Sequence, residues 1–244
     1  MIQKKAILQT LPKPFKQSAK KILKFPLMLK TRAELLMSGV EPLANTWNQR
    51  GESIHRTYLE QFLQEFSKDI KGHCLEFQED SYTSRFGRTQ VTKLDILHKE
   101  TDNPKATIVA DLTQPNDVPS NTFDCIICTY TLHVIPDLDY MVGELHRILK
   151  PSGVLLVAVP DITRNYPQYN ELWRFTAKGL HLLLAKSFGD ENVTVKTYGN
   201  SMTAAGELRG MTVEDFTTAQ LNYHDPRYAL VVCARCVKKS ENLS

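Results

Sequence analysis

The sequence predicts an α/β protein built on a doubly wound, mostly parallel sheet. From about residue 72 onward, strand-like and helix-like segments alternate, and several strand candidates are apolar throughout. Alternation is typical of parallel strands joined by crossover helices, and unbroken apolar runs are typical of strands covered on both faces. The final strand candidate is followed by no helix, so it is free to lie antiparallel to its neighbours.

Each element is predicted from its residue pattern. In the first helix, predicted over 53–70, Ile54, Tyr58, Phe62 and Phe66 recur every four residues, which gives one apolar stripe. Two more helical patterns cover 138–149 and 173–188. Seven strand candidates complete the predicted fold: 73–77, 90–94, 106–109, 123–129, 154–159, 192–198 and 228–237.

Composition favours an ordinary globular domain with appended ends. The 244 residues are 42% hydrophobic and 23% charged, and no apolar run reaches the length of a membrane-spanning helix. We expect a basic extension, partly helical or disordered, over 1–46, a folded domain over 47–239 and a disordered end over 240–244. With no signal-peptide pattern at the start, the expected location is cytoplasmic.

Positive charge is concentrated at the N-terminus. Nine of the first 33 residues are Lys or Arg and none is acidic, whereas the whole chain has a net charge of only +3. The body is therefore net acidic, and we expect no nucleic-acid partner. The basic segment either contacts an anionic membrane surface or another protein, or is a solvated extension.

Two Cys-x-x-Cys pairs suggest a metal site at first sight, Cys125 with Cys128 and Cys233 with Cys236. Both pairs lie in strand-like runs, where residues three apart point to opposite faces of a sheet. We therefore interpret these cysteines as buried thiols and expect no metal site.

Three segments carry a family resemblance. NTFDCIICTYTLHVIPDLDYMVGELHRILKPSGVLLVAVP, VTKLDIL and ATIVADL are similar to the fourth and fifth, second, and third strand regions of class I S-adenosylmethionine (SAM)-dependent methyltransferases of type 11. The resemblance covers roughly residues 72–160. It implies a Rossmann-like, seven-stranded fold and SAM as the cofactor. YTSRFG, WRFT and YGN resemble a bacterial subgroup often found beside glycosyltransferases, which suggests a role in polysaccharide tailoring.

The resemblance implies where SAM binds. Asp95, followed by Ile96, is expected at the C-terminal end of the second strand, where its carboxylate would accept hydrogen bonds from the ribose hydroxyls. Asp111 is expected to bind the adenine amino group while the N–H of Leu112 also faces the base. From the residues alone, Asp95 is equally a cap or turn residue and Asp111 an Asx turn.

The turn after the first strand contains no glycine. Glu76 is expected to end that strand and to hold the SAM ammonium or the N–H groups of the turn. Gln78, Asp80 and Tyr82 stand where most relatives have glycines. We expect Asp80 to pair with the ammonium and Tyr82 to lie near the sulfonium as a cation–π partner. The alternative is an acidic turn without a binding role.

The end of the fourth strand is predicted to face the reaction. Thr129 is expected to contact SAM and Tyr130 the acceptor, and His133 is the candidate general base for an oxygen acceptor. A packing or capping role is the alternative for His133. Asp161 and the pair His224-Asp225 are weaker candidates for the base.

Acceptor contacts are expected from segments that follow the fifth strand. Asp161 comes directly after that strand, and Trp173 with Arg174 offers an aromatic wall and an anion or sugar contact. The alternative is that these two residues simply begin a helix, with Arg174 solvated.

The sequence therefore predicts a SAM-dependent methyltransferase that transfers the methyl group to an oxygen of a small polar or sugar-related acceptor. The rival interpretation is a catalytically silent relative that binds a glycosyltransferase or another protein. A nicotinamide-dependent oxidoreductase is disfavoured because the first turn lacks G-x-G-x-x-G.

Overall fold

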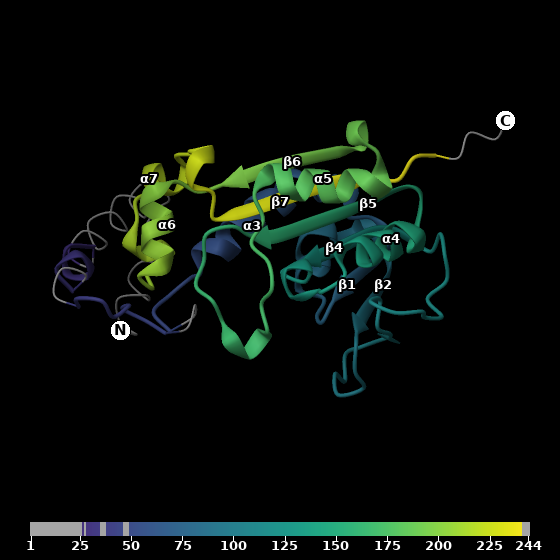
Figure 1. Ribbon diagram of the computed structural model, residues 1–244, viewed down its shortest axis with the longest axis horizontal. Helices are drawn as coiled ribbons and strands as arrows, with labels where there is room; N and C mark the ends of the chain where they lie inside the picture. The colour runs from purple at the N-terminus through teal and green to yellow at the C-terminus, as the bar shows by residue number, and fades with distance from the viewer. Residues whose placement is uncertain (1–25, 27, 35–37, 46–48, 241–244) are drawn as a thin grey trace.

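The computed structural model describes residues 26, 28–34, 38–45 and 49–240, and its centre is one seven-stranded sheet (Figure 1). The strands follow the order β3-β2-β1-β4-β5-β7-β6. β7 pairs antiparallel with both β5 and β6, and every other neighbouring pair is parallel. The predicted fold, including the antiparallel last strand, is confirmed. The strands are β1 (Gly72–Phe77), β2 (Val91–His98), β3 (Ile108–Val109), β4 (Phe123–Thr129), β5 (Leu149–Pro160), β6 (Val193–Tyr198) and β7 (Val231–Val237).

Helices cover both faces of the sheet. α4 (Leu138–Ile148) and α5 (Ala177–Phe188) pack on one face, and α3 (Ile54–Glu65) packs on the other with α6 (Ser201–Leu208) and α7 (Thr218–Asn222). All five of these helices begin behind a residue whose side-chain oxygen accepts a backbone N–H of the first turn: Ser53, Asp137, Thr176, Asn200 and Thr217. This capping sets the helix starts.

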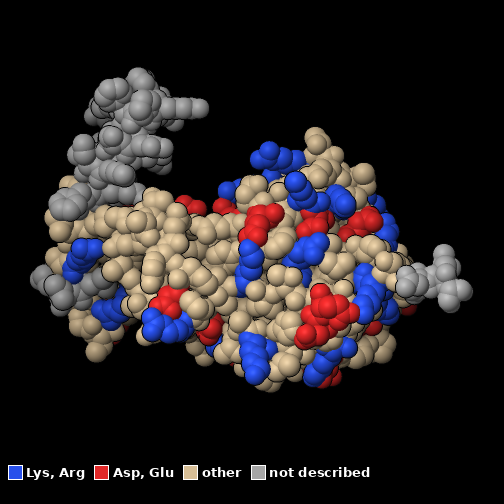
Figure 2. All heavy atoms as spheres, turned by 90° about the horizontal axis from the view of Figure 1, so that it is seen from above, with Lys and Arg blue, Asp and Glu red and all other residues tan. Residues whose placement is uncertain are grey.

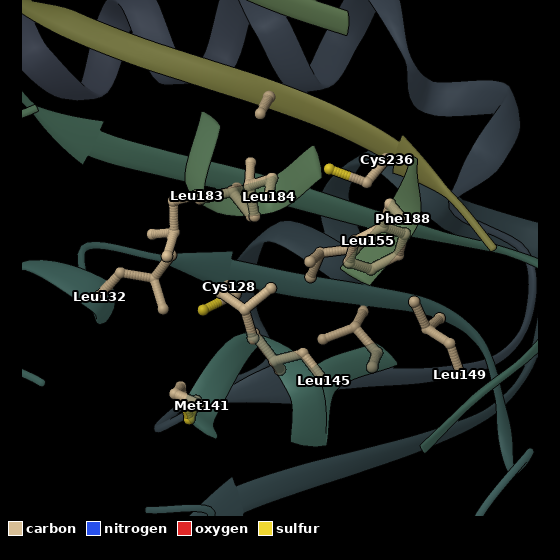
Figure 3. Close-up of a cluster of buried hydrophobic side chains, with 14 of the residues drawn as sticks. Cys128, Leu132, Met141, Leu145, Leu149, Leu155, Leu183, Leu184, Phe188 and Cys236 are labelled. Carbon is tan, nitrogen blue, oxygen red and sulfur yellow. The ribbon is translucent and has the colours of Figure 1, made fainter. Parts of the chain in front are cut away.

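Two apolar cores lie on the two faces of the sheet. Figure 3 shows part of the first, where Met141 and Leu145 of α4 and Leu184 and Phe188 of α5 face the strands. The cysteine pairs divide between the cores: Cys128 and Cys236 belong to this core, and Cys125 and Cys233 belong to the α3 core. The predicted opposite orientation within each pair is confirmed, because strand side chains alternate.

Several element ends differ from the prediction. The second strand continues four residues beyond 94 to His98, because its apolar residues pair with both β1 and β3. The first helix stops at Glu65 rather than 70, and Ser67–Asp69 form a short 3₁₀ turn. The helix predicted from 173 begins only at Ala177, behind the Thr176 cap, so its first four predicted residues are extended.

Charge is mixed over the visible surface of the domain. On the face shown in Figure 2, Lys and Arg side chains alternate with Asp and Glu and form no broad field of one sign. Within the described residues, no helix is long and apolar enough to cross a bilayer. Most of the basic extension predicted over 1–46, which we expect to be partly helical or disordered, lies outside the described residues.

Candidate functional site

The carboxyl ends of β1, β4 and β5 meet at one edge of the sheet, where ligands of open α/β folds bind. Three segments leave this edge: the first turn (residues 78–82), the segment starting at Tyr130, and the segment starting at Asp161. Asp161 is fixed to the edge by its N–H, which donates to Leu230 O at 2.9 Å, and burial raises the pKa of its carboxyl. Thr129, Tyr130 and Asp161 thus lie at the predicted edge.

Glu76 organises the first turn from below. Its carboxylate is almost fully buried in β1 and accepts the N–H of Tyr82 at 3.0 Å and of Thr83 at 2.7 Å. Burial raises the pKa of Glu76, and hydrogen bonds from Thr83 and Tyr82 partly offset that rise. Of the two roles predicted for Glu76, the structure therefore shows the one that holds the N–H groups of the turn.

The first turn keeps a glycine-like backbone without glycine. Gln78 has a φ of 69°, in the left-handed region that favours glycine, and its carbonyl accepts Asn103 Nδ2 at 2.6 Å. Asp80 is partly exposed and lies 3.5 Å from Lys105 Nζ. Side chains from the segment between β2 and β3 therefore hold this turn at two points.

Tyr82 lies in the core that packs under α3, with Phe86. Its side chain is largely buried, and burial followed by the charges of nearby Arg56, Glu60, Glu76 and Glu79 leaves the pKa of its phenol raised. This position packs the turn against the α3 core.

The predicted position of Asp95 is wrong. Asp95 lies inside β2, paired in register with Leu75 and three residues before the strand ends at His98. Its carboxylate is already bound by His73 Nε2 at 2.6 Å, Lys93 Nζ at 3.0 Å and Thr107 Oγ1 at 2.8 Å. Thr107 Oγ1 also accepts the N–H of Ile96. Three further strand residues follow Asp95, so its carboxylate lies away from the edge of the sheet. The ribose contact predicted for Asp95 stays a prediction.

Asp111 does lie at the edge, two residues after β3. It accepts the N–H and hydroxyl of Thr113 at 2.9 and 2.6 Å, which is the Asx turn considered as its alternative role. Lys99, the first residue after β2, places its ammonium 3.2 Å from the same carboxylate. Burial would raise the pKa of Asp111, but these partners lower it below its usual range. Leu112 beside it is buried.

Tyr130 begins the segment after β4 in a strained conformation. Its φ is 47°, unusual for a bulky residue, and its N–H donates to Ala158 O at 2.8 Å. Its ring meets His133 edge-on, with ring centroids 6.5 Å apart. The Tyr130 hydroxyl and His133 Nδ1 are both buried without a hydrogen-bond partner among the described residues.

His133 is attached to the segment that follows β5. Its carbonyl accepts the N–H groups of Leu172 and Trp173, and its Nε2 lies 3.5 Å from Glu171 Oε1. Burial lowers the pKa of His133, against a smaller opposing effect of Glu171. The ring is therefore held neutral at pH 7, as a proton acceptor requires.

Trp173 and Arg174 are anchored side chains. Trp173 Nε1 donates to Ile135 O at 2.8 Å, and the residue is 42% exposed. Arg174 donates to Glu171 at 2.6 Å and to Arg164 O at 2.9 Å. The predicted helix start at Trp173 is wrong, because the helix begins at Ala177. Arg174 is exposed, as that alternative expected, and it also pairs with the buried carboxylate of Glu171.

Sequence reasoning missed a second group of polar residues beside Tyr130. His55, near the start of α3, lies with its Nδ1 3.1 Å from Glu207 Oε1 of α6, and its ring meets Tyr130 edge-on at 6.1 Å. Arg164 stacks over Tyr166 at 5.5 Å and donates to Ala44 O. The one available signal was His55 itself, a polar residue on the apolar stripe of a helix; the burial of Glu207 has no sequence signature.

His224 and Asp225 lie elsewhere. His224 lines a cavity of about 540 Å³ between α3, β6 and α7, and its Nε2 is 2.8 Å from Thr197 Oγ1. Asp225 caps the following turn and pairs with Arg227. Their contacts are local and include neither Tyr130 nor His133.

SAM fits this edge unevenly. At the amino-acid end, Asp80 offers a carboxylate that a ligand ammonium can reach, and the nearby unpartnered buried atoms of Tyr130 and His133 show hydrogen-bonding capacity that the fold leaves unused. At the ribose end, the residue directly after β2 is Lys99, and the first carboxylate beyond it belongs to the exposed Glu100. The arrangement suits a cationic amino-acid group at the first turn, and Asp95, the residue predicted for the ribose, already has three partners within the chain.

Comparisons with known proteins indicate which family the sequence and the fold resemble. A family model described as a methyltransferase domain matches residues 75–157. Demethylmenaquinone methyltransferase of Lysinibacillus sphaericus is 29% identical over 93 residues, 38% of each chain. The same enzyme of Listeria monocytogenes is 26% identical over 63% of this chain and 61% of its own. The arginine-hydroxylase NDUFAF5 of Rattus norvegicus is 38% identical, but over only 25% of this chain and 17% of its own. The chain thus spans less than two thirds of each of these relatives.

Solved structures share the fold at low identity. A SAM-dependent methyltransferase from Archaeoglobus fulgidus superposes with a TM-score of 0.51 at 11% identity, covering 78% of this chain and 96% of its own. The [4+2]-cyclase SpnF superposes with a TM-score of 0.51 at 14% identity, covering 86% and 93%. Residues 75–157 therefore match a methyltransferase domain, and the chain shares its Rossmann-like fold with a solved SAM-dependent methyltransferase.

Proposed function

We propose that the protein is an enzyme that transfers a methyl group from SAM to a small acceptor. The methyltransferase domain match carries this proposal, because it spans β1, β2, β3 and β4, whose carboxyl ends form the candidate site. When bound, SAM supplies an electrophilic methyl group on a sulfonium. The chain would hold its ammonium at Asp80 and orient the turn through Glu76.

Binding of SAM separates an enzyme from a silent relative. Isothermal titration calorimetry with SAM and with S-adenosylhomocysteine should give micromolar affinity. No heat and no thermal stabilisation at millimolar ligand would reject the enzyme and favour the silent binding partner. The fold alone does not establish methyl transfer, because the relatives and structural neighbours include proteins named as a hydroxylase and a cyclase.

For the ribose, we propose Glu100, the first carboxylate beyond the end of β2, in place of Asp95. Glu100→Ala should weaken SAM binding about tenfold, the loss expected for a charged hydrogen bond. Asp95→Asn is the matched variant and should leave the affinity within about twofold while lowering stability. The reverse outcome would restore the sequence prediction for Asp95.

We propose a hydroxyl-bearing acceptor, with a sugar or glycan as the first candidate. Trp173 supports this, because an exposed aromatic ring whose position is fixed by a hydrogen bond is suited to stacking on a sugar ring. The named quinone methyltransferases among the relatives make a quinol the competing acceptor. Tritium transfer from labelled SAM to a panel of sugars, glycans and quinols would decide between the two; labelling of quinols alone would reject the sugar.

The general base predicted for such an acceptor is His133, whose ring is neutral and carries an unpartnered Nδ1. Turnover that survives in His133→Ala would reject that role without affecting the fold assignment. We also propose that the protein works in the cytoplasm and that its basic N-terminal segment contacts an anionic membrane or a partner protein. Liposome co-sedimentation of the full chain and of a chain lacking residues 1–33 would test the membrane contact.

A further inference from the structure

Tyr130 is near two histidine–glutamate pairs. One is His55 with Glu207 and the other is His133 with Glu171, and both imidazoles meet the phenol ring edge-on. Both carboxylate side chains are about 95% buried. A buried carboxylate–imidazole pair is the arrangement by which proteins orient a histidine that moves protons.

The contacts of the His133–Glu171 pair are structural. Glu171 accepts hydrogen bonds from Arg174 and from the N–H of Tyr166, besides facing His133. The backbone carbonyl of His133 accepts two further N–H groups of the same segment. This pair therefore fastens the segment after β5 to the end of β4.

Each pair leaves one ring nitrogen without a partner among the described residues, Nδ1 in His133 and Nε2 in His55. Glu207 faces Nδ1 of His55, and Nε2 of the same ring is buried with no hydrogen-bond partner among the described residues. His55 itself is 9% exposed. One nitrogen is thus occupied by a carboxylate, and the other keeps its full hydrogen-bonding capacity.

This pair is also poorly placed for helix stability. His55 is the second residue of α3, at the positive end of the helix dipole, and Glu207 is the last but one of α6, at the negative end. A carboxylate is disfavoured at the negative end, as an imidazolium is at the positive end. A buried pair of this kind is weak evidence for a stabilising role, since apolar residues of similar size often serve as well. Its presence beside an unused nitrogen points to chemistry.

Tyr130 links this pair to the segment after β5, because its ring meets the rings of both His55 and His133 edge-on. Tyr166 of that segment donates its N–H to Glu171, and Arg164 stacks over the Tyr166 ring. Burial, above all, raises the pKa of Tyr130 well above its usual range. Four buried polar atoms of this group lack partners among the described residues: Tyr130 Oη, His55 Nε2, His133 Nδ1 and Arg164 Nε.

We propose that His55, oriented by Glu207, is the general base that accepts the acceptor's hydroxyl proton, and that the acceptor binds against Tyr130. The inference rests on the proposed methyltransferase function and assigns the proton to His55 instead of His133. Glu207 Oε1 lies 3.1 Å from Nδ1, so a proton held on Nδ1 would leave the lone pair of the ring on Nε2.

The step balances without a further reactant. The acceptor O–H bond breaks and its proton moves to His55 Nε2, while the acceptor oxygen forms a bond to the methyl carbon. The bond from that carbon to sulfur breaks and its electron pair stays on sulfur, which leaves S-adenosylhomocysteine. The imidazolium is balanced by Glu207 and later releases the proton to water.

Diethyl pyrocarbonate tests the free nitrogen without knowledge of the acceptor, because it acylates unprotonated imidazole nitrogens. His73 is the matched control within the chain: it is also paired with a carboxylate, but its Nε2 is the nitrogen occupied, 2.6 Å from Asp95. The side chain of His73 is the more exposed, 17% against 11% for His55. We expect mass spectrometry to show acylation of His55 at least tenfold faster than of His73. An order that follows exposure instead would overturn the proposal.

The positioning role of Glu207 is read from the ring itself. ¹⁵N spectra of histidine-labelled protein, assigned with His55→Gln, should show the Nδ1–H tautomer of His55 in the native chain. Glu207→Gln should shift the population toward Nε2–H by at least threefold, which loss of packing alone would not do selectively. A native ring found as Nε2–H would contradict a base at that nitrogen.

Cofactor binding separates failure of this inference from failure of the proposed function. His55→Gln should bind SAM within threefold of the native affinity and lose about a hundredfold or more in methyl transfer to any acceptor that the native chain labels. If the native chain binds no SAM, the proposed function is overturned. If it binds SAM but His55 is unreactive or carries its proton on Nε2, only the assignment of the base falls.

Discussion

The two ends of the sheet edge differ in how their polar groups are satisfied. Around the first turn and β2, the carboxylates of Glu76, Asp80, Asp95 and Asp111 all have partners within the chain. Around Tyr130, buried polar atoms of His55, Tyr130 and His133 have none among the described residues. The first end is built to hold its shape, and the second keeps hydrogen-bonding capacity for a ligand. Substitutions at the two ends should therefore change stability in opposite directions.

Glu76→Ala should have the largest effect. It leaves two buried N–H groups of the first turn without an acceptor, which we expect to lower the free energy of unfolding by about 3 kcal/mol. Urea denaturation followed by circular dichroism would measure the loss. Glu76→Gln retains one acceptor oxygen and should lose less; equal losses for both variants would show that the charge, and not the hydrogen bonds, matters.

Tyr130→Phe should change stability in the other direction. It removes a buried hydroxyl that has no partner, and we expect the free energy of unfolding to rise by up to about 1 kcal/mol. Tyr58→Phe is the matched control, because the Tyr58 hydroxyl donates to Leu221 O at 2.9 Å, and its removal should cost about 1 kcal/mol. If both variants are destabilised equally, the contrast between the two ends does not hold.

Acid should weaken the first end through Asp95. Burial would raise the pKa of Asp95, but hydrogen bonds from His73, Lys93 and Thr107 lower it below the ordinary value of 3.8. As pH falls, the unfolded chain then takes up the proton before the folded one, so stability present above pH 3.8 is lost below it. Asp95→Asn should be less stable at pH 6 and should lose less on acidification. Parallel pH curves for the two proteins would contradict this.

Lys105→Ala should have the smallest effect on stability. Its ion pair with Asp80 is exposed, so the expected change is below about 0.5 kcal/mol. The same change frees Asp80 for a ligand ammonium, and SAM affinity should rise about twofold by calorimetry. A fall in affinity would indicate that Lys105 positions Asp80 instead of competing for it.

Much of the site edge could be predicted from sequence. The strand that ends at Thr129 and the turns after Glu76 and near Asp111 follow from local patterns, so residues adjacent to strand ends were located correctly. Asp95 was placed wrongly, because the strand predicted over 90–94 ended four residues too early. In a run of alternating polar and apolar residues, an aspartate inside a strand has the same local pattern as one that follows it. Where a strand ends depends on whether a neighbour pairs with it, and that partner, β3, lies more than ten residues further along the chain.

The sequence by itself determined the layered α/β fold, the direction of the last strand and the opposite orientation of the paired cysteines, because periodicity and chain order suffice for these features. Only the tertiary structure decided which polar groups meet. His55 and Glu207 are 152 residues apart in number, on helices that no local pattern connects, and they face each other because both helices pack on the same face of the sheet. A contact between distant segments is set by packing, which single-residue chemistry does not encode.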